Sequence, residues 1–140
     1  GIRPLLCIGE TAEEKKYGIS GEILRQQLKI GFYEIDPEEC KNIWVAYEPV
    51  WSIGVNGIPA TAEYAQKMHM EIKKALREIF GDNAEQIPVL YGGSVNPENA
   101  DQLILQPAID GLFVGRAAWD AEAFDKLIRH SIHTYKQNNI

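Results

Sequence analysis

Short apolar runs alternate with longer amphipathic stretches along the whole chain. Four runs are mainly apolar and bounded by turn residues, which favours β-strands; they cover residues 4–8, 43–47, 88–91 and 111–114. Their apolar character is continuous rather than alternating, as in parallel strands that are covered on both faces. We therefore predict four strands of a parallel sheet.

The stretches between these runs have the periodicity of amphipathic helices. The clearest pattern sets apolar residues three and four positions apart on one face: Ala65, Met68, Ile72, Ala75 and Ile79. Thr61 is the expected N-cap of this helix. Further helices are predicted over residues 20–32, from Asn96 with Pro97 at the first helical position, and from Asp120 onward.

The resulting order of elements, βαβαβαβα, predicts an α/β fold with a parallel sheet and right-handed crossovers. Such a sheet is either part of a closed barrel or an open, doubly wound sheet, and periodicity does not choose between them. Residues 1–140 show no internal repeat, low-complexity tract or linker. We treat them as one unit without a separate second domain.

The composition limits the classes of partner. With 45% hydrophobic and 24% charged residues among 140, the chain has the material for one globular core. A net charge of −6 and the absence of any run of Lys or Arg argue against nucleic acid and against a membrane surface as partners. An anionic ligand would then need a local trap.

Cysteine usage and hydropathy indicate the compartment. Cys7 and Cys40 have neither CxxC nor Cys/His ligand spacing, so we expect two reduced thiols and no metal site. No apolar stretch approaches the roughly 20 residues that a bilayer-spanning helix needs. A cytoplasmic location is the expectation.

Chemistry is expected at the carboxyl ends of the strands, where ligands bind in barrels and in open α/β sheets alike. Glu48 directly follows the second predicted strand, and Pro49 stiffens the chain that leads away from it. A carboxylate fixed at this place can act as a base in proton transfer. The alternative is a surface glutamate or a structural hydrogen-bond acceptor.

A loop with two glycines follows Glu48 over residues 50–60. Stiff residues near both ends and apolar residues within it are typical of a hinged lid that excludes water from a reacting centre. The alternative is a mobile connection whose Trp51 and Ile53 pack on the rim of the sheet.

Two glycine clusters follow the third and fourth predicted strands. Gly92, Gly93 and Ser94 permit a close approach of the backbone to a ligand, and their N–H groups can cradle a phosphate near the start of the next helix. Gly115 and Arg116 offer the same geometry and a cation. Each cluster alone also fits a tight turn, but two clusters after successive strands are more specific.

Other polar residues are expected to be structural or solvated. His69, His130 and His133 lie on predicted helices, whose side chains face away from the strand ends. Residues 13–16 and 73–74 are interpreted as charged faces in contact with water.

Four segments together resemble the triosephosphate isomerase family, in the order and spacing of that family. They are Cys7-Ile8-Gly9-Glu10, Ala46-Tyr47-Glu48-Pro49-Val50-Trp51, Tyr91-Gly92-Gly93-Ser94-Val95 and Asp110-Gly111-Leu112-Phe113-Val114-Gly115. The resemblance covers essentially the whole chain and implies the fifth to eighth βα units, the C-terminal half, of a TIM (β/α)8 barrel. The chain enters an apolar run directly after Gly1, which we expect of a start inside a domain.

The resemblance also implies roles for individual residues. Glu48 would shuttle a proton between adjacent carbons of a small phosphorylated sugar through an enediol. The phosphate would be held by residues of the lid and of the two glycine clusters: Ile53, Gly54, Gly92, Gly93, Ser94, Gly115 and Arg116. The lid and its hinge would include Pro49, Val50, Trp51 and Ser52, with Glu10 positioning the tryptophan. No metal ion and no organic cofactor is implied.

Three departures from the family leave the substrate open. The lysine and histidine that the family draws from its first four βα units are absent here, the lid is about one residue longer than usual, and Arg116 replaces a second glycine. The first interpretation is interconversion of dihydroxyacetone phosphate and glyceraldehyde 3-phosphate, as in glycolysis and gluconeogenesis. The second is isomerisation of a four-carbon ketose phosphate such as erythrulose phosphate, and the third is a non-catalytic phosphate-binding half-barrel.

A sheet of four strands has two open edges. We therefore expect these residues to associate, either with another copy as a homo-oligomer or with an N-terminal half. We expect negligible isomerase activity from residues 1–140 alone.

Overall fold

The computed structural model describes residues 1–138 of the chain. Its four strands form one parallel sheet in which each strand pairs with the next along the chain: β1 (Leu5–Ile8), β2 (Trp44–Tyr47), β3 (Val89–Tyr91) and β4 (Gly111–Leu112). Ile8 is in register with Tyr47, and Tyr47 with Tyr91, so the carboxyl ends of these strands lie side by side. The predicted parallel α/β fold is confirmed.

The strands are shorter than predicted, partly because two of the predicted runs begin with proline. Pro4 accepts a hydrogen bond from the Trp44 N–H and Pro88 accepts one from the Val45 N–H. Neither proline has an N–H group to donate in return. The regular strands therefore begin one residue later.

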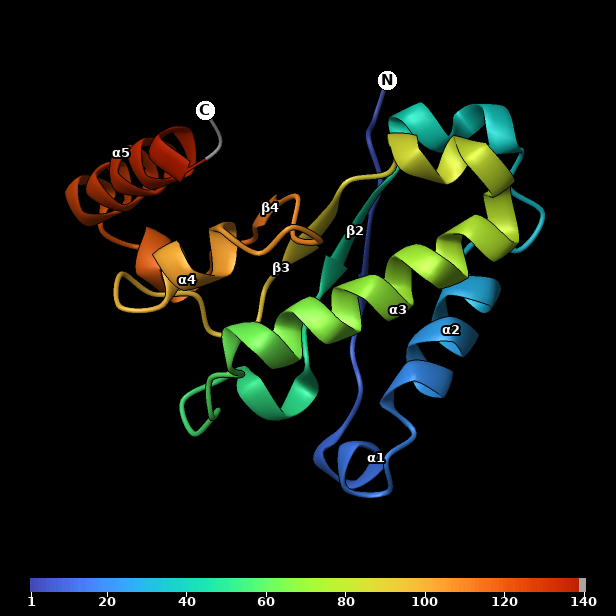
Figure 1. The fold of residues 1–140 in the computed structure, drawn as a ribbon, viewed down its shortest axis with the longest axis horizontal. Coiled ribbons are helices and arrows are strands. Elements are labelled where there is room, and N and C mark those ends of the chain that lie inside the picture. The colour runs from blue at the N-terminus through green and yellow to red at the C-terminus, as the bar shows by residue number, and fades with distance from the viewer. Residues whose placement is uncertain (139–140) are drawn as a thin grey trace.

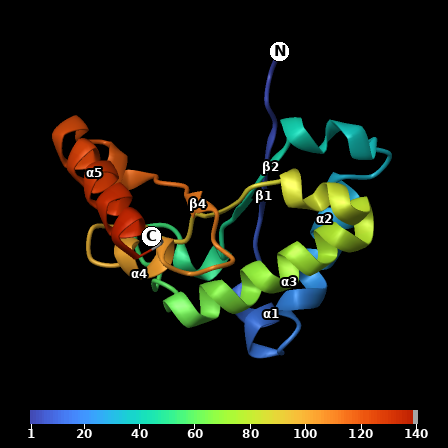
Figure 2. The same cartoon turned by 45° about the horizontal axis from the view of Figure 1, so that its top comes forward.

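Within residues 1–138, five α-helices and four 3-10 segments connect and follow the strands. The α-helices are α1 (Ala12–Lys16), α2 (Ser20–Gly31), α3 (Ala62–Phe80), α4 (Ala100–Ile104) and α5 (Ala121–Asn138). The 3-10 segments are η1 (Pro37–Asn42), η2 (Val50–Ser52), η3 (Gly81–Gln86) and η4 (Arg116–Ala118). Figure 1 shows α2 and α3 side by side, and Figure 2 shows α4 between the sheet and α5.

Threonine side chains cap two of the helices. Thr61 accepts a hydrogen bond from the Tyr64 N–H at 3.2 Å, so the predicted N-cap of α3 is confirmed. Thr11 and Glu14 form a capping box at the start of α1, a short helix that periodicity did not predict.

The helix predicted from Asn96 starts later, at Ala100, and this prediction was wrong. The Asn96 side chain accepts hydrogen bonds from the N–H groups of Glu98 and Asn99, while the Asn99 side chain accepts one from the Asn96 N–H. These bonds satisfy the backbone in a turn, the competing structure that asparagine favours. Pro97 therefore lies in this turn and not in the first turn of α4.

The helices cover one face of the sheet. Leu6 on β1 points toward α2, where a Cβ added to Gly31 would lie 2.6 Å from its Cδ2 atom. Its neighbour Cys7 is exposed, so the expected cover of both faces is not found within residues 1–138. Both cysteines are free thiols; Cys40 is buried in η1.

The core lies between the sheet and α3. The predicted apolar face of α3 is confirmed, with Ala65, Met68, Ile72 and Ala75 buried and Ile79 partly buried against them. His69 is fully buried beside this face, between the rings of Tyr47 and Tyr91. It is therefore structural, whereas His130 and His133 on α5 are exposed.

Two features are absent from the part of the chain that the structure describes. No helix within residues 1–138 combines the length and the apolar character needed to cross a membrane. The same residues contain no group of three or more His, Cys, Asp or Glu side chains placed to hold a metal ion.

Candidate active site

A cavity of about 570 Å³ lies where the lid meets the carboxyl ends of β2, β3 and β4. Its lining comes from the lid and from the segments that follow these strands: Glu48, Ile53, Gly54, Gly57, Pro59, Gly92, Ser94, Val95, Asn96, Phe113, Gly115, Arg116 and Ala117. The structure thus brings together the predicted base and all predicted phosphate-binding residues except Gly93.

Glu48 is fixed at the end of β2 by its backbone and by its neighbours. Its N–H donates to the Ile8 carbonyl at 2.7 Å, and its carbonyl lies against Gly9, where no Cβ would fit. The half-buried side chain lies over Gly92; a Cβ there would stand 2.7 Å from Glu48 Cγ and 2.9 Å from Oε1. Burial raises the pKa of the Glu48 carboxyl above its ordinary value.

The backbone after β3 is held in an unusual conformation. Ser94 has a positive φ of 55°, which is uncommon for a residue with a side chain, and its hydroxyl donates to the Ser52 carbonyl of the lid hinge. Gly93 lies behind the cavity wall, packed against the Tyr91 hydroxyl and the Ser52 side chain. Gly93 therefore supports the cradle from behind and does not line it.

The lid is tied at both ends and exposed between them. At its start, the Val50 N–H donates to the Glu10 carbonyl at 2.9 Å. Near its end, the Ile58 N–H donates to the Trp51 carbonyl at 3.3 Å. Between these ties Val55 is 88% exposed, so the apolar tip has no protein cover within residues 1–138.

Arg116 connects the segment after β4 to the lid. Its Nη2 atom donates to the Gly54 carbonyl at 2.8 Å, and Gly54 adopts a positive φ of 85° that glycine tolerates without strain. Arg116 and Glu48 are the charged residues of the cavity lining. The cavity therefore has a carboxylate at the end of β2 and a guanidinium at the rim.

Glu10 is a fully buried carboxylate beneath the lid hinge. Its oxygens accept hydrogen bonds from the Tyr47 hydroxyl at 3.0 and 3.1 Å, from the Trp51 indole N–H at 2.8 Å and from the Tyr64 hydroxyl at 2.8 Å. Burial is the main cause that raises the pKa of Tyr64 to about 12, and it raises the pKa of Tyr47 further. Both phenols are therefore neutral donors at physiological pH.

A lysine covers the outer side of the lid tryptophan. Lys15 Nζ lies 3.3 Å from the ring centroid of Trp51 and 4.7 Å from that of Tyr64. Glu10 thus contacts Trp51 as expected, and Lys15 is exposed, as expected of a solvated face, but it also contacts the aromatic rings of the hinge. The ammonium group stacks on aromatic rings, a favourable contact even near the surface.

Comparison with known proteins assigns the family. The family model described as triosephosphate isomerase matches residues 1–131. The chain belongs to the triosephosphate isomerase family. Within that family it is 50% identical over 125 residues to the "L-erythrulose-1-phosphate isomerase" of Rhizobium etli, covering 89% of this chain and 46% of the relative.

Other members of the triosephosphate isomerase family with a different name are similar at nearly the same level. The "Triosephosphate isomerase" of Protochlamydia amoebophila is 46% identical over 129 residues, which cover 91% of this chain and 48% of that protein. The one of Fusobacterium nucleatum is 45% identical over 130 residues, which cover 92% and 51%. The chain spans about half the length of these curated relatives.

Sequence reasoning missed Tyr64 and Lys15 as parts of the triosephosphate isomerase-like hinge. Tyr64 lies next to the apolar face of α3 and resembles an ordinary aromatic residue at the edge of a core. Lys15 lies among charged residues of a short helix. Neither residue belongs to one of the four recognised segments, so only their spatial contacts with Trp51 reveal them.

Proposed function

We propose that this chain supplies the base and the phosphate grip of an aldose–ketose isomerase that acts on a small phosphorylated sugar. The observation that carries the proposal is the place of the Glu48 carboxylate, which lies over Gly92 in the cavity lined by Ser94, Gly115 and Arg116. Reacting carbon and phosphate can then be held at different places in one cavity, which separates chemistry from binding.

Glu48 acts by moving one proton. The carboxylate removes a proton from the carbon next to the carbonyl, which leaves an enediolate, and returns it to the neighbouring carbon after a proton has moved between the two substrate oxygens. A raised pKa makes this carboxylate a stronger base than an exposed one. No lysine or histidine among residues 1–138 lines the cavity, so proton transfer at the substrate oxygens requires a group from another part of the complete protein.

The opposite side of the cavity suits a phosphate. Gly54, Ser94 and Gly115 present backbone from three separate loops, and Arg116 adds a cation with several donors. Binding energy from a remote phosphate can hold the lid over the reacting centre, where exclusion of water strengthens electrostatic interactions. Such a local trap also suits a chain with a net charge of −6.

For the substrate we propose a four-carbon ketose phosphate. Relatives named L-erythrulose-1-phosphate isomerase are 50% and 48% identical to the chain in Rhizobium etli and Rhizobium meliloti and 43% in Brucella abortus, and two named triosephosphate isomerase are 46% and 45% identical. Arg116 and the longer lid, which both lie at the ligand cavity, agree with a modified substrate. The triose phosphates remain the second candidate.

Turnover by the full-length protein that contains this chain tests both the proposed isomerase activity and the proposed substrate. L-erythrulose 1-phosphate and dihydroxyacetone phosphate are supplied as competing substrates, and the former is expected to have the higher kcat/KM. A preference for dihydroxyacetone phosphate would assign the triose reaction instead.

Replacing Glu48 by Gln tests its role as the base and should lower kcat roughly 10²- to 10⁴-fold. The control Glu71→Gln, on the exposed side of α3, should leave kcat unchanged. Full activity of the Glu48 variant would rule out its role as the base.

The remaining expectations about surroundings are proposals of the same kind. We propose that the open edges of the sheet pair with another part of the complete protein or with another copy, since β1 and β4 each have one unpaired side within residues 1–138. A cytoplasmic location stays a prediction.

A further inference from the structure

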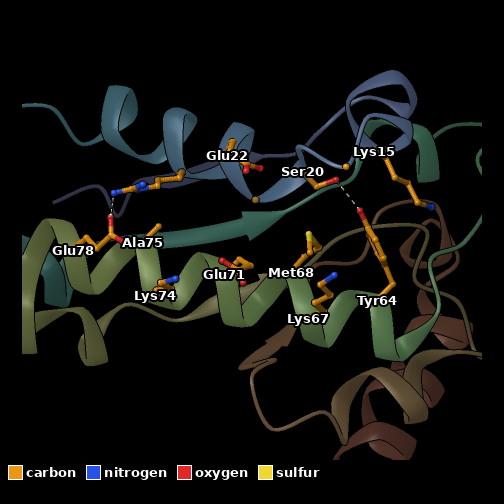
Figure 3. Close-up of a pocket in the computed structure, with 13 residues that line it drawn as sticks. Lys15, Ser20, Glu22, Tyr64, Lys67, Met68, Glu71, Lys74, Ala75 and Glu78 are labelled. Atoms are coloured by element: carbon orange, nitrogen blue, oxygen red, sulfur yellow. Dashed lines mark hydrogen bonds and ion pairs between the residues drawn. The ribbon is translucent and has the colours of Figure 1, made fainter.

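A groove of about 440 Å³ separates α2 from α3, and one end of it reaches the lid hinge. Figure 3 shows Ser20, Tyr64 and Lys15 together at this end, with Glu78 and Ala75 toward the other end. The Ser20 hydroxyl lies 3.1 Å from the Tyr64 hydroxyl. Since Tyr64 also contacts Glu10 and the ring of Trp51, the groove connects physically with the start of the lid.

The number of hydrogens around Glu10 fixes the direction of each bond. The carboxylate only accepts, and its three partners each have one hydrogen to give: the hydroxyls of Tyr47 and Tyr64 and the indole N–H of Trp51. The Tyr64 hydrogen points to Glu10, so the Ser20 hydroxyl must donate to the Tyr64 oxygen. The hydrogens therefore run in one direction from Ser20 through Tyr64 to Glu10, an arrangement in which each bond polarises the next.

The three donors differ in the elements that carry them. Tyr47 lies on β2 and Tyr64 on α3, two regular elements that meet in the core. Trp51 lies on η2, at the start of the lid. Tyr47 and Tyr64 are therefore fixed donors, and Trp51 is the donor that leaves if the lid moves.

Tyr64 and Trp51 donate to the same carboxylate oxygen. Glu10 Oε1 accepts both bonds at 2.8 Å, whereas the single hydrogen of the Tyr47 hydroxyl is shared between Oε1 at 3.1 Å and Oε2 at 3.0 Å. If Trp51 departs, Tyr64 still serves Oε1 and Tyr47 still serves Oε2. Without the Tyr64 hydroxyl, the same departure would leave both oxygens of the buried carboxylate to share the one hydrogen of Tyr47, which is costly.

We propose that Tyr64 is a positioning residue that sets the opening and closing balance of the lid, by keeping Glu10 satisfied when Trp51 leaves it. Removal of its hydroxyl should then hold Trp51 on Glu10 more firmly and make lid movement harder. The opposite would follow if Tyr64 only helped to pin Trp51, because its loss would then free the tryptophan.

Exchange of the Trp51 indole hydrogen measures this balance without any assay of activity. In the full-length protein, ¹⁵N-labelled tryptophan and hydrogen exchange give the protection of the Trp51 indole, assigned by its loss in Trp51→Phe. Tyr64→Phe should slow this exchange roughly tenfold, the ratio that corresponds to one hydrogen bond to a charged group. The matched control Tyr33→Phe, at a tyrosine that is 74% exposed, should leave the exchange unchanged.

A second variant protects the test against misfolding at position 64. Ser20→Ala removes the hydroxyl that donates to Tyr64 and should slow the exchange in the same direction by a smaller factor. Unchanged or faster exchange in Tyr64→Phe, or in Ser20→Ala where only that variant folds, would overturn the proposal.

A kinetic measurement extends the test and rests on the proposed function. If closure of the lid on bound ligand requires Trp51 to leave Glu10, a less favourable closure should raise KM of Tyr64→Phe roughly tenfold with little change in kcat. A purely structural defect at position 64 would instead displace Glu48 and lower kcat. If the full-length protein has no isomerase activity, the proposed function fails, while the exchange measurement still decides the role of Tyr64.

Discussion

The side chain of Glu48 lies directly on Gly92, across the boundary between the ends of β2 and β3. A Cβ atom at position 92 would approach Glu48 Cγ to 2.7 Å, a distance at which one of the two must move. The ring of Phe113 lies on the other side, 3.1 Å from the same Cβ position, so an added methyl group would also crowd this ring. The place of the candidate base thus depends on the absence of a side chain one strand away.

Gly92→Ala should therefore reduce catalysis through displacement of Glu48. We expect kcat to fall roughly 10²-fold, as for a misplacement of about 1 Å, with a smaller change in KM. Steady-state kinetics of the full-length protein measures both values. Gly21→Ala on α2, where the added methyl meets only ordinary contacts, is the matched control and should behave as the parent protein. Equal kinetics in the two variants would show that Glu48 does not need this space.

The raised pKa of Glu48 predicts the acid side of the pH profile. The base acts when deprotonated, so kcat/KM should fall as pH drops through the pKa of the free protein. Burial raises that pKa, so the fall should be centred above the ordinary value of 4.5. The profile of kcat/KM against pH tests this prediction. The values are corrected for ionisation of the substrate phosphate, so that the remaining pH dependence reports the protein. A midpoint at or below 4.5 would contradict the burial seen here.

Stability should also depend on pH, through His69. Burial lowers the pKa of His69 from 6.5 to about 3, and neither ring nitrogen has a hydrogen bond of normal geometry; the Ala108 backbone offsets only part of the burial effect. As pH falls below 6.5, His69 binds a proton in the unfolded chain but stays neutral in the folded chain until pH approaches 3. Stability is therefore complete above pH 6.5 and is lost as pH falls toward 3, by about 2 kcal/mol between pH 7 and 5.

Urea unfolding at pH 7 and pH 5 measures the His69 effect. His69→Phe keeps an aromatic ring between Tyr47 and Tyr91 and should remove this part of the pH dependence. His133→Phe on the exposed side of α5 should retain it. The same loss of stability in the parent and in His69→Phe would assign the pH dependence to other groups.

The contact of Lys15 with Trp51 predicts an effect opposite to that of Tyr64→Phe. Lys15→Met removes the ammonium from the face of the indole, and Trp51 should leave Glu10 more easily. We expect exchange of the Trp51 indole hydrogen to rise about fivefold, since a cation–π contact contributes roughly 1 kcal/mol. Lys16→Met, one position along α1, serves as the control. Identical exchange in both variants would reduce Lys15 to a solvated lysine, as its sequence context suggested.

The open edges of the sheet predict self-association of residues 1–140 prepared alone. β1 and β4 each pair on one side within the described residues, and Cys7 leaves part of one face exposed. Unpaired edges and uncovered faces favour pairing with other chains. Light scattering should show dimers or larger species. Their mass should fall when the N-terminal half of the complete protein is added, because that half would cover the open edges in place of other copies. A monodisperse monomer at micromolar concentration would refute this prediction.

The parallel sheet and the α3 face could be predicted because local pattern and tertiary structure agree there. The first three apolar runs end where their strands end, whereas the fourth strand stops at Leu112, two residues before its run. Ala65, Met68, Ile72 and Ala75 are buried as their spacing requires. Glu48 and the glycine clusters were predictable for a related reason: in a parallel sheet, residues after each strand meet at one edge.

Most of the hinge contacts could not be predicted, because they join residues far apart in the sequence; the contact of Glu10 with Trp51 was expected only from the resemblance to the family. Glu10 collects donors from Tyr47, Trp51 and Tyr64, which belong to three different elements, and no periodicity encodes their meeting. The start of α4 failed for a local reason. Pro97 signals a helix start, but the side chain of Asn96 bonds to the backbone ahead of it and keeps the chain in a turn.

The hydrogen bond between the Ile58 N–H and the Trp51 carbonyl holds the two ends of the lid together, so the residues between them form a closed loop. Residues added to or removed from this loop would change how far it extends, while the chain before Trp51 and after Ile58 would stay in place. The room available to a ligand can therefore vary through the length of one loop, with the base at the end of β2 undisturbed. Under the proposed function, an insertion or deletion in this loop would suit a longer or shorter sugar phosphate without any change to Glu48.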